Sequence, residues 1–211
     1  ASTEPGLLGR NALGPPETRA EIARQLRDEA RQLLADTGLF ALLAARWSEP
    51  AVTGSAGYDL MVWRDLDIHA AVEADRWPDW LAFGGELAAQ LDSVGLGLHK
   101  ATFVNDYVDP HPLGAGLYWG LEFKDFAGNP WQVDIWGWDP FDYAVRQARD
   151  FSLRTDLAAC DRDLILRLKT EARARDNYYG TRISAWDIYQ FCIAGGGTSL
   201  SELEQWKKAQ G

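Results

Sequence analysis

The sequence predicts an α+β protein, a mixed β-sheet with flanking helices that is followed by a C-terminal helical segment. In the first part of the chain, apolar residues alternate with polar ones in short runs such as residues 66–72, and helical patterns lie between these runs. Alternation with a period of two is typical of a strand with one buried face, whereas apolar spacings of three and four indicate a helix. From residue 140 onward no strand pattern remains, so we expect the chain to continue as helices.

The predicted domain organisation has three parts. We expect residues 1–14 to form a flexible N-terminal arm, residues 15–139 to form the sheet-and-helix domain, and residues 140–211 to form a helical domain. A chain of 211 residues has room for one domain with an appendage or for two small domains.

The first predicted elements are two helices. The spacing of apolar residues predicts a helix that begins after Pro15-Pro16 and runs to about residue 36, because proline is favoured in the first turn of a helix. Gly38 is its predicted stop, since glycine accepts the left-handed conformation that often follows a helix. Residues 39–47 are predicted to form a second, short helix.

The next segments predict most of the sheet. We expect strands at residues 51–53, 66–72, 98–104, 117–124 and 131–138, and a helix at residues 77–93 that begins with a Trp-Pro-Asp sequence. The last two strands flank a turn sequence and therefore predict a hairpin. Residues 109–114 are predicted to be a loop because of their Pro and Gly. The C-terminal segment predicts helices at residues 141–159, 161–175, 184–194 and 199–209.

Composition narrows the classes of function. The formal net charge is −10, which argues against a nucleic-acid partner, because lysine and arginine supply most of the affinity for a phosphate backbone. Cys160 and Cys192 have no metal-ligand spacing, so a zinc site is not expected. No apolar run is long enough for a membrane span, and the first residues do not resemble a signal peptide. We therefore expect a cytoplasmic protein without a membrane partner.

Three aspartates stand out as candidates for chemistry. Asp65 and Asp67 alternate with Leu66 and Ile68, so both carboxylates should project from the same face of a strand. Two adjacent carboxylates repel each other unless a cation lies between them. A Gly-Ser pair precedes them by nine residues, and Asp134 lies in a later predicted strand. This pattern predicts a metal site on the sheet.

The order and spacing of these pieces resemble a known superfamily. Val52-Thr53-Gly54-Ser55, then Asp65-Leu66-Asp67-Ile68, then Asp134 within Trp131-Gln132-Val133-Asp134-Ile135-Trp136, are similar to the motif of the polymerase-β-type nucleotidyltransferases. That motif is a hydrophobic strand, Gly-Ser, about ten residues, an Asp-x-Asp strand and a third carboxylate on a following strand. The resemblance covers about residues 48 to 138, and the small size resembles the minimal and antibiotic-modifying bacterial members.

The resemblance implies a set of roles. Asp65, Asp67 and Asp134 would be catalytic and would bind Mg²⁺, expected as two ions, while Gly54 and Ser55 would bind the nucleotide. Asp65 and Asp67 would hold the metal of the triphosphate, and Asp134 would complete the second metal site and help to activate the acceptor hydroxyl. The expected partners are ATP or another NTP and a hydroxyl acceptor, and a homodimer is left open.

The function implied is Mg²⁺-dependent transfer of a nucleoside monophosphate from an NTP to a hydroxyl of a small molecule, such as a cationic antibiotic. Three alternatives stay open. The chain could modify a protein or a tRNA, as toxin–antitoxin members of the family do, or it could be a catalytically inactive nucleotide-binding module. A glycosyltransferase can also use Asp-x-Asp, although it would not require the Gly-Ser pair or the later aspartate.

Other polar residues carry weaker expectations. His69 shares the strand face of Asp67 and is expected to be a packed or surface residue rather than a ligand. Whether Glu122 and Lys124 share the face of Asp134 depends on the hairpin register, which the sequence does not fix. Arg64 is expected to point away from the aspartates. The helical segment carries further cations that are each expected on a solvated helix face, namely Arg146, Arg149, Lys169 and Arg182.

Overall fold

The computed structural model of the chain describes residues 18–109 and 114–210. The predicted arm at residues 1–14 and most of the predicted loop at residues 109–114 lie outside them. The helices are α1 (Arg19–Thr37), α2 (Leu39–Arg46), α3 (Gly54–Gly57), α4 (Trp77–Ser93), α5 (Pro140–Ala158), α6 (Arg162–Arg173), α7 (Ala185–Ile193) and α8 (Leu200–Gln210), with a 3₁₀ turn at Ala74–Arg76. The strands are β1 (Ser48–Thr53), β2 (Asp65–Ala71), β3 (Leu98–Asn105), β4 (Leu117–Lys124) and β5 (Pro130–Trp138).

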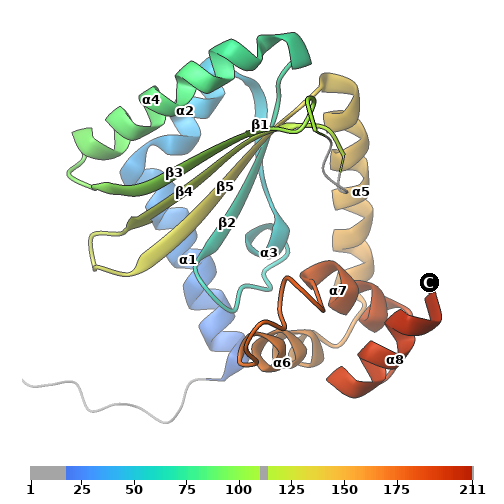
Figure 1. Ribbon diagram of the computed structural model, residues 1–211. Helices are drawn as coiled ribbons and strands as arrows, with labels where there is room; N and C mark the ends of the chain where they lie inside the picture. The colour runs from blue at the N-terminus through green and yellow to red at the C-terminus, as the bar shows by residue number, and fades with distance from the viewer. Residues whose placement is uncertain (1–17, 110–113, 211) are drawn as a thin grey trace, which may run out of the picture.

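The five strands form one sheet in the order β1-β2-β5-β4-β3. β2 and β5 are parallel, while the other neighbouring pairs are antiparallel. The predicted fold class, a mixed sheet with flanking helices and a helical C-terminal segment, is therefore confirmed. Figure 1 shows α1, α2 and α4 on one side of the sheet and α5 on the other, with α6, α7 and α8 gathered at one end.

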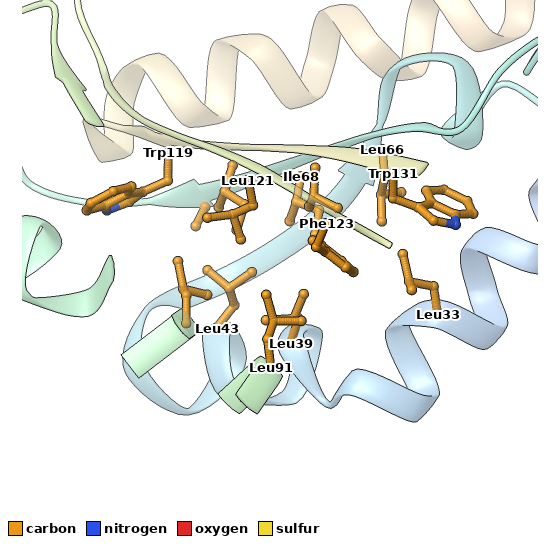
Figure 2. Packing of buried hydrophobic residues seen from close by; sticks show 14 of the residues in the cluster. Leu33, Leu39, Leu43, Leu66, Ile68, Leu91, Trp119, Leu121, Phe123 and Trp131 are labelled. Carbon is orange, nitrogen blue, oxygen red and sulfur yellow. The ribbon is translucent and has the colours of Figure 1, made fainter. Parts of the chain in front are cut away.

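The helices α1, α2 and α4 bury one face of the sheet. Leu66 and Ile68 of β2 are fully buried there, and they belong to the same apolar cluster as Leu39 of α2 and Leu91 of α4. Figure 2 shows these side chains meeting between the strands and the helices. Because successive residues of a strand point to opposite faces, this packing directs the residues that alternate with Leu66 and Ile68 to the other face of the sheet.

Local signals in the sequence explain the ends of α1. Thr18 caps the helix in a capping box, in which its backbone N–H donates to Glu21 at 2.7 Å and its hydroxyl oxygen accepts from the Glu21 N–H. The cap is thus Thr18, three residues later than the first proline of the predicted start. Gly38 ends the helix with a φ of 66°, as predicted from the conformational freedom of glycine.

The C-terminal helices have their own apolar cluster. It contains Ile165, Leu168 and Phe191, and it also takes in Leu60 from the segment before β2 and Ala23 from α1. The helical segment thus packs against the first part of the chain at the end of the sheet, whereas the proposed boundary near residue 140 remains a prediction. Of the helices that the structure describes, none is long and apolar enough to cross a membrane.

Candidate active site

The strand register brings the three aspartates together. Asp67 of β2 and Asp134 of β5 are direct partners in the parallel pair, and Asp65 lies opposite Gln132, two pairs earlier. Since the neighbouring residues of β2 are buried in the helix-covered face, Asp65 and Asp67 share the opposite face with Asp134, as the sequence predicted.

The electrostatics of this cluster are unfavourable for the protein alone. Burial raises the pKa of Asp65 to about 6, and repulsion by Asp134 adds to the effect. Burial also holds the pKa of Asp67 well above its usual range, with repulsion by Asp65 and Asp134 as further causes. The attraction of Lys169 acts in the opposite direction on both groups. In addition, Oδ1 of Asp65 is buried and has no hydrogen-bond partner among the residues that the structure describes. A cluster of three carboxylates, which offers acceptors only, is well suited to bind a cation.

Position 54 requires a glycine because Asp67 lies directly against it. Gly54 has a φ of 60°, and a Cβ atom at this position would lie 2.0 Å from Oδ2 of Asp67. Any other residue would therefore be strained and would also displace the carboxylate. The Gly-Ser pair predicted as a nucleotide-binding turn thus has a structural reason for its glycine, which is to make room for the second aspartate.

The hydroxyl of Ser55 is held by a buried lysine. Lys169 of α6 is fully buried, and its Nζ donates to Ser55 Oγ at 2.6 Å, to the carbonyl oxygen of Leu60 at 2.7 Å and to Tyr189 Oη at 3.0 Å. Burial lowers its pKa to about 7, and attraction to Asp65 and Asp67 opposes that shift. The expectation of a solvated Lys169 was therefore wrong, because the lysine lies on the apolar side of α6.

The sequence holds a signal that could have located Lys169. On α6 it follows Ile165 by four residues and precedes Ala172 by three, and both are fully buried. A lysine within such an apolar stripe is unusual, since charged residues are rarely buried without partners. Arg173, one turn further, lies with its guanidinium 4.3 Å from the ring centroid of Trp63, and its charge lowers the pKa of Asp65.

A carboxylate of α5 holds the residues that flank the Gly-Ser pair. Asp150 accepts a hydrogen bond from Thr53 Oγ1 at 2.6 Å and another from the hydroxyl of Tyr58. Thr53 is the last residue of β1 and Tyr58 follows α3, so this one carboxylate fixes both ends of the turn. Nothing in the sequence pattern pointed to Asp150, because the contact spans about ninety residues and depends on how α5 packs.

The third aspartate has partners on β4 and β5. Oδ1 of Asp134 accepts from the hydroxyl of Tyr118 at 2.8 Å and from Gln132 Nε2 at 3.2 Å. Burial raises the pKa of Asp134, and these two hydrogen bonds act in the opposite direction. The Asp134 carboxylate is thus held in place by hydrogen bonds from both neighbouring strand residues.

Three other residues that the sequence analysis considered have partners of their own in the structure. His69 packs its ring 5.7 Å from that of Trp138, and burial lowers its pKa to about 4, so it is a packed, neutral histidine. The register places Glu122 on the face of Asp134, where it pairs with Lys100 at 2.7 Å. Arg64 donates to Glu29 of α1 at 2.8 Å and so points away from the aspartates, as predicted.

Four other cations of the sequence analysis lie outside the carboxylate cluster. Lys124, Arg149 and Arg182 are exposed. Arg146 is half-buried, with its guanidinium 3.4 Å from the ring centroid of Trp138, so the expectation of a solvated position was wrong for this residue.

A cleft opens at one end of the sheet, next to α1 and the first residues of β5. Its volume is about 660 Å³, and its lining includes Trp63, Gln132 and Arg173 as well as residues of α1. Trp63 precedes Asp65 closely in the chain, and Gln132 contacts Asp134. The cleft therefore borders on neighbours of the aspartates, while none of the three aspartates is among its lining residues.

The three aspartates fit a hard divalent cation by their chemistry. They offer only oxygen ligands, which Mg²⁺ prefers. Their negative charges repel one another, and one of their buried oxygens has no hydrogen-bond partner among the described residues. Within residues 18–109 and 114–210, no three His, Cys, Asp or Glu side chains are already arranged as a finished ion site.

Comparison with known proteins identifies the fold. No protein-family model and no curated protein matches this sequence. Among solved structures, that of Cid1, reported with RNA terminal uridylyl transferase activity, matches with a TM-score of 0.51 and 17% identity over 78% of this chain and 46% of its own. The Cid1 poly(U) polymerase with MgGTP bound matches with a TM-score of 0.50 and 17% identity, over 78% and 48% of the two chains.

These matches show a nucleotidyltransferase fold, as the sequence resemblance implied. The chain spans about half the length of the solved structures that it matches.

Proposed function

We propose that this protein is a Mg²⁺-dependent nucleotidyltransferase that moves a nucleoside monophosphate from an NTP to a hydroxyl group of an acceptor. The observation that carries the proposal is the pairing of Asp67 with Asp134 across parallel strands, with Asp65 beside them and the Ser55–Lys169 contact nearby. The shared fold with a uridylyl transferase that binds MgGTP supports it.

The aspartates would hold the metal. Asp65 and Asp67 would bind the ion that accompanies the triphosphate, and Asp134 would complete the site of a second ion. When bound, Mg²⁺ supplies Lewis-acid stabilisation of the charge that develops on the phosphate oxygens. The raised pKa values of Asp65 and Asp67 support this assignment, because a cation between these carboxylates offsets both the burial and the repulsion that raise them.

The triphosphate would lie against Gly54 and Ser55. Lys169 already holds the Ser55 hydroxyl, and Arg173 lies one turn further along α6. Phosphate oxygens are strong acceptors for both kinds of cation. We therefore assign Arg173 to the β- and γ-phosphates. Lys169, whose three donors are already used, would hold the Ser55 hydroxyl in place beside them.

In the proposed reaction, the oxygen of the acceptor hydroxyl attacks the α-phosphorus of the NTP. The bond from the α-phosphorus to the oxygen that bridges to the β-phosphate breaks, and pyrophosphate leaves with the electron pair. The hydroxyl proton passes to Asp134, or to water if the bound metal lowers its proton affinity enough. The chain contributes positioning and charge compensation, which dominate catalysis of phosphoryl-type transfers.

For the acceptor, we propose a small molecule. The net charge of −10 favours a cationic acceptor such as an aminoglycoside. An RNA end is the second candidate, and the activity reported for Cid1 favours it, despite the weak electrostatic attraction between this acidic chain and RNA. A protein acceptor and a catalytically inactive nucleotide-binding module are outcomes that the experiment below distinguishes.

The test is a transfer assay with NTPs that carry ³²P at the α- or the γ-phosphate. Each NTP is incubated with Mg²⁺ and with cationic antibiotics, tRNA or cell lysate in turn. We expect α-label on one acceptor class, γ-label in pyrophosphate, and loss of transfer in Asp134→Asn but not in the exposed control Asp92→Asn. Transfer of γ-label to an acceptor would overturn the proposal, and NTP binding without any transfer would favour the inactive module.

A further inference from the structure

The side chain of Tyr118 reaches Asp134 only because the residue between them is a glycine. Gly120 of β4 lies directly opposite Asp134 of β5. A Cβ atom on Gly120 would lie 2.3 Å from the Tyr118 hydroxyl oxygen. The phenol therefore runs along β4 over Gly120 and donates its proton to Oδ1 of Asp134 at 2.8 Å. Glycine in the interior of a strand often marks such a close approach.

Aromatic neighbours fix the phenol in this position. The ring of Tyr118 lies 4.7 Å from that of Trp136, its direct partner on β5. Trp136 in turn stacks on Trp138 with centroids 4.8 Å apart and an angle of 6° between the planes. Trp138 is almost fully buried, so the stack is anchored in the protein. Tyr118 thus approaches Asp134 from a rigid support.

The two oxygens of Asp134 have unequal surroundings. Oδ1 accepts from Tyr118 at 2.8 Å, while the bond that Oδ2 accepts from the described residues is a longer one, from Gln132 Nε2 at 3.3 Å. The side chain of Gln132 is exposed, so water can replace that weaker bond. One oxygen is therefore held by a rigid donor, and the other remains available to a ligand.

We propose that Tyr118 is a positioning residue that orients Asp134 for the second metal ion, and that Gly120 is needed to let Tyr118 act. The inference rests on the proposed function, since it assigns Tyr118 a role only if Asp134 binds an ion. Partners that hydrogen-bond to metal-ligating carboxylates usually change metal affinity by about 10- to 100-fold when they are removed. A tyrosine that served packing alone would have no such effect.

The experiment counts bound Mn²⁺ by electron paramagnetic resonance, in the presence of α,β-methylene-ATP, which cannot be turned over. The wild type is expected to bind two ions, and Asp134→Asn one. Tyr118→Phe keeps the ring and removes the hydrogen-bond donor. It should therefore lower the affinity for the second ion by about tenfold or more and leave the affinity for the first ion unchanged. Gly120→Ala should lower the affinity for the same ion, because the added methyl group displaces the phenol, although neither Tyr118 nor Asp134 is substituted.

Matched controls exist for both changes. Tyr178 donates to Glu204 at 2.7 Å in the helical segment, so Tyr178→Phe removes the same kind of hydrogen bond away from the aspartates. A Cβ atom on Gly85 of α4 meets nothing within 4 Å, so Gly85→Ala is the control for Gly120→Ala. Both controls should bind two ions with wild-type affinity, and thermal unfolding of each variant shows that it is folded.

The possible outcomes distinguish a failure of the role of Tyr118 from a failure of the proposed function. Weakening of the second ion alone, in both Tyr118→Phe and Gly120→Ala, would support the inference. A wild type with two ions and a folded Tyr118→Phe variant with unchanged affinity for both would overturn the inference and leave the proposed function standing. A wild type that binds no Mn²⁺ with the analogue would overturn the proposed function and the inference together.

Discussion

The two sides of the sheet face that carries the aspartates are built differently. On the side of β1 and β2, Ser55 is held by Lys169 and Thr53 by Asp150, so helices α6 and α5 fix the residues around the Gly-Ser turn. On the side of β4 and β3, beyond Tyr118 and its hydrogen bond to Asp134, a polar contact is the solvent-exposed pair of Lys100 and Glu122. The chain therefore constrains the proposed donor end closely and leaves the β3 side of this face more open to solvent.

The largest expected effect is that of Asp67→Asn on the donor side. Transfer should fall by about 10³-fold or more, because several kcal/mol of charge stabilisation depend on the metal ligand and each 1.36 kcal/mol is a factor of ten in rate. Steady-state rates with α-labelled NTP measure it. Wild-type turnover in a folded Asp67→Asn variant would show that Asp67 is not needed as a metal ligand, and the β1–β2 side would not be the donor side.

Gly54→Ala tests the close packing of the same side. The added methyl group would collide with Asp67, and a displacement of about 1 Å in an active site can cost about 10²-fold in rate. Gly97→Ala is the control, since nothing lies within 4 Å of a Cβ atom there. Equal rates for the two variants would mean that the position of Asp67 is not critical.

Lys169→Met tests the contact from the helical segment. It removes three hydrogen bonds from the Nζ atom, and charge-assisted hydrogen bonds contribute about 1.5–3 kcal/mol each. We expect affinity for a non-hydrolysable NTP to fall by about tenfold or more in calorimetric titrations. Arg167→Met removes a cation of the same helix that pairs with Glu171, and it should bind normally; equal losses in both variants would contradict the role of Lys169.

The stability of the metal-free protein should respond in the opposite direction to its activity. Because the pKa of Asp65 is raised from 3.8 to about 6, its carboxyl contributes stability below pH 4 that is lost as the pH rises through 6. Relative to wild type, Asp65→Asn should therefore gain up to about 3 kcal/mol at pH 8 and little at pH 4. Urea unfolding in EDTA at both values measures this, and a gain independent of pH would contradict it.

The smallest expected effect lies on the open side. Exposed ion pairs such as Lys100–Glu122 contribute about 0–1 kcal/mol, so Lys100→Met should change the free energy of unfolding by less than that. NTP affinity should also stay constant. A clear loss of NTP affinity in Lys100→Met would show that the donor extends over β3 and β4, and the contrast between the two sides would disappear.

Much of this architecture was predictable from short-range patterns. The alternation around Leu66 and Ile68 predicted β2 and the shared face of Asp65 and Asp67. Local signals at Gly38 and at the Trp-Pro-Asp start of α4 predicted helix ends correctly. These features depend on backbone conformation and periodicity within a few residues, which a sequence displays directly.

The contacts that complete the site depend on long-range packing. Lys169 and Asp150 reach the Gly-Ser turn from helices about a hundred residues away in the chain. The position of Gly120 opposite Asp134 depends on the β4–β5 register, which a hairpin sequence with a longer loop does not fix. Only Lys169 left a trace in the sequence, as a lysine within an apolar stripe.

Diffraction from crystals grown with Mn²⁺ and α,β-methylene-ATP tests the central claim most directly. The anomalous signal of Mn²⁺ should lie between Asp65 and Asp67, with the β- and γ-phosphates next to Ser55 and Lys169. A nucleotide bound elsewhere, or an anomalous signal away from these aspartates, would contradict the account.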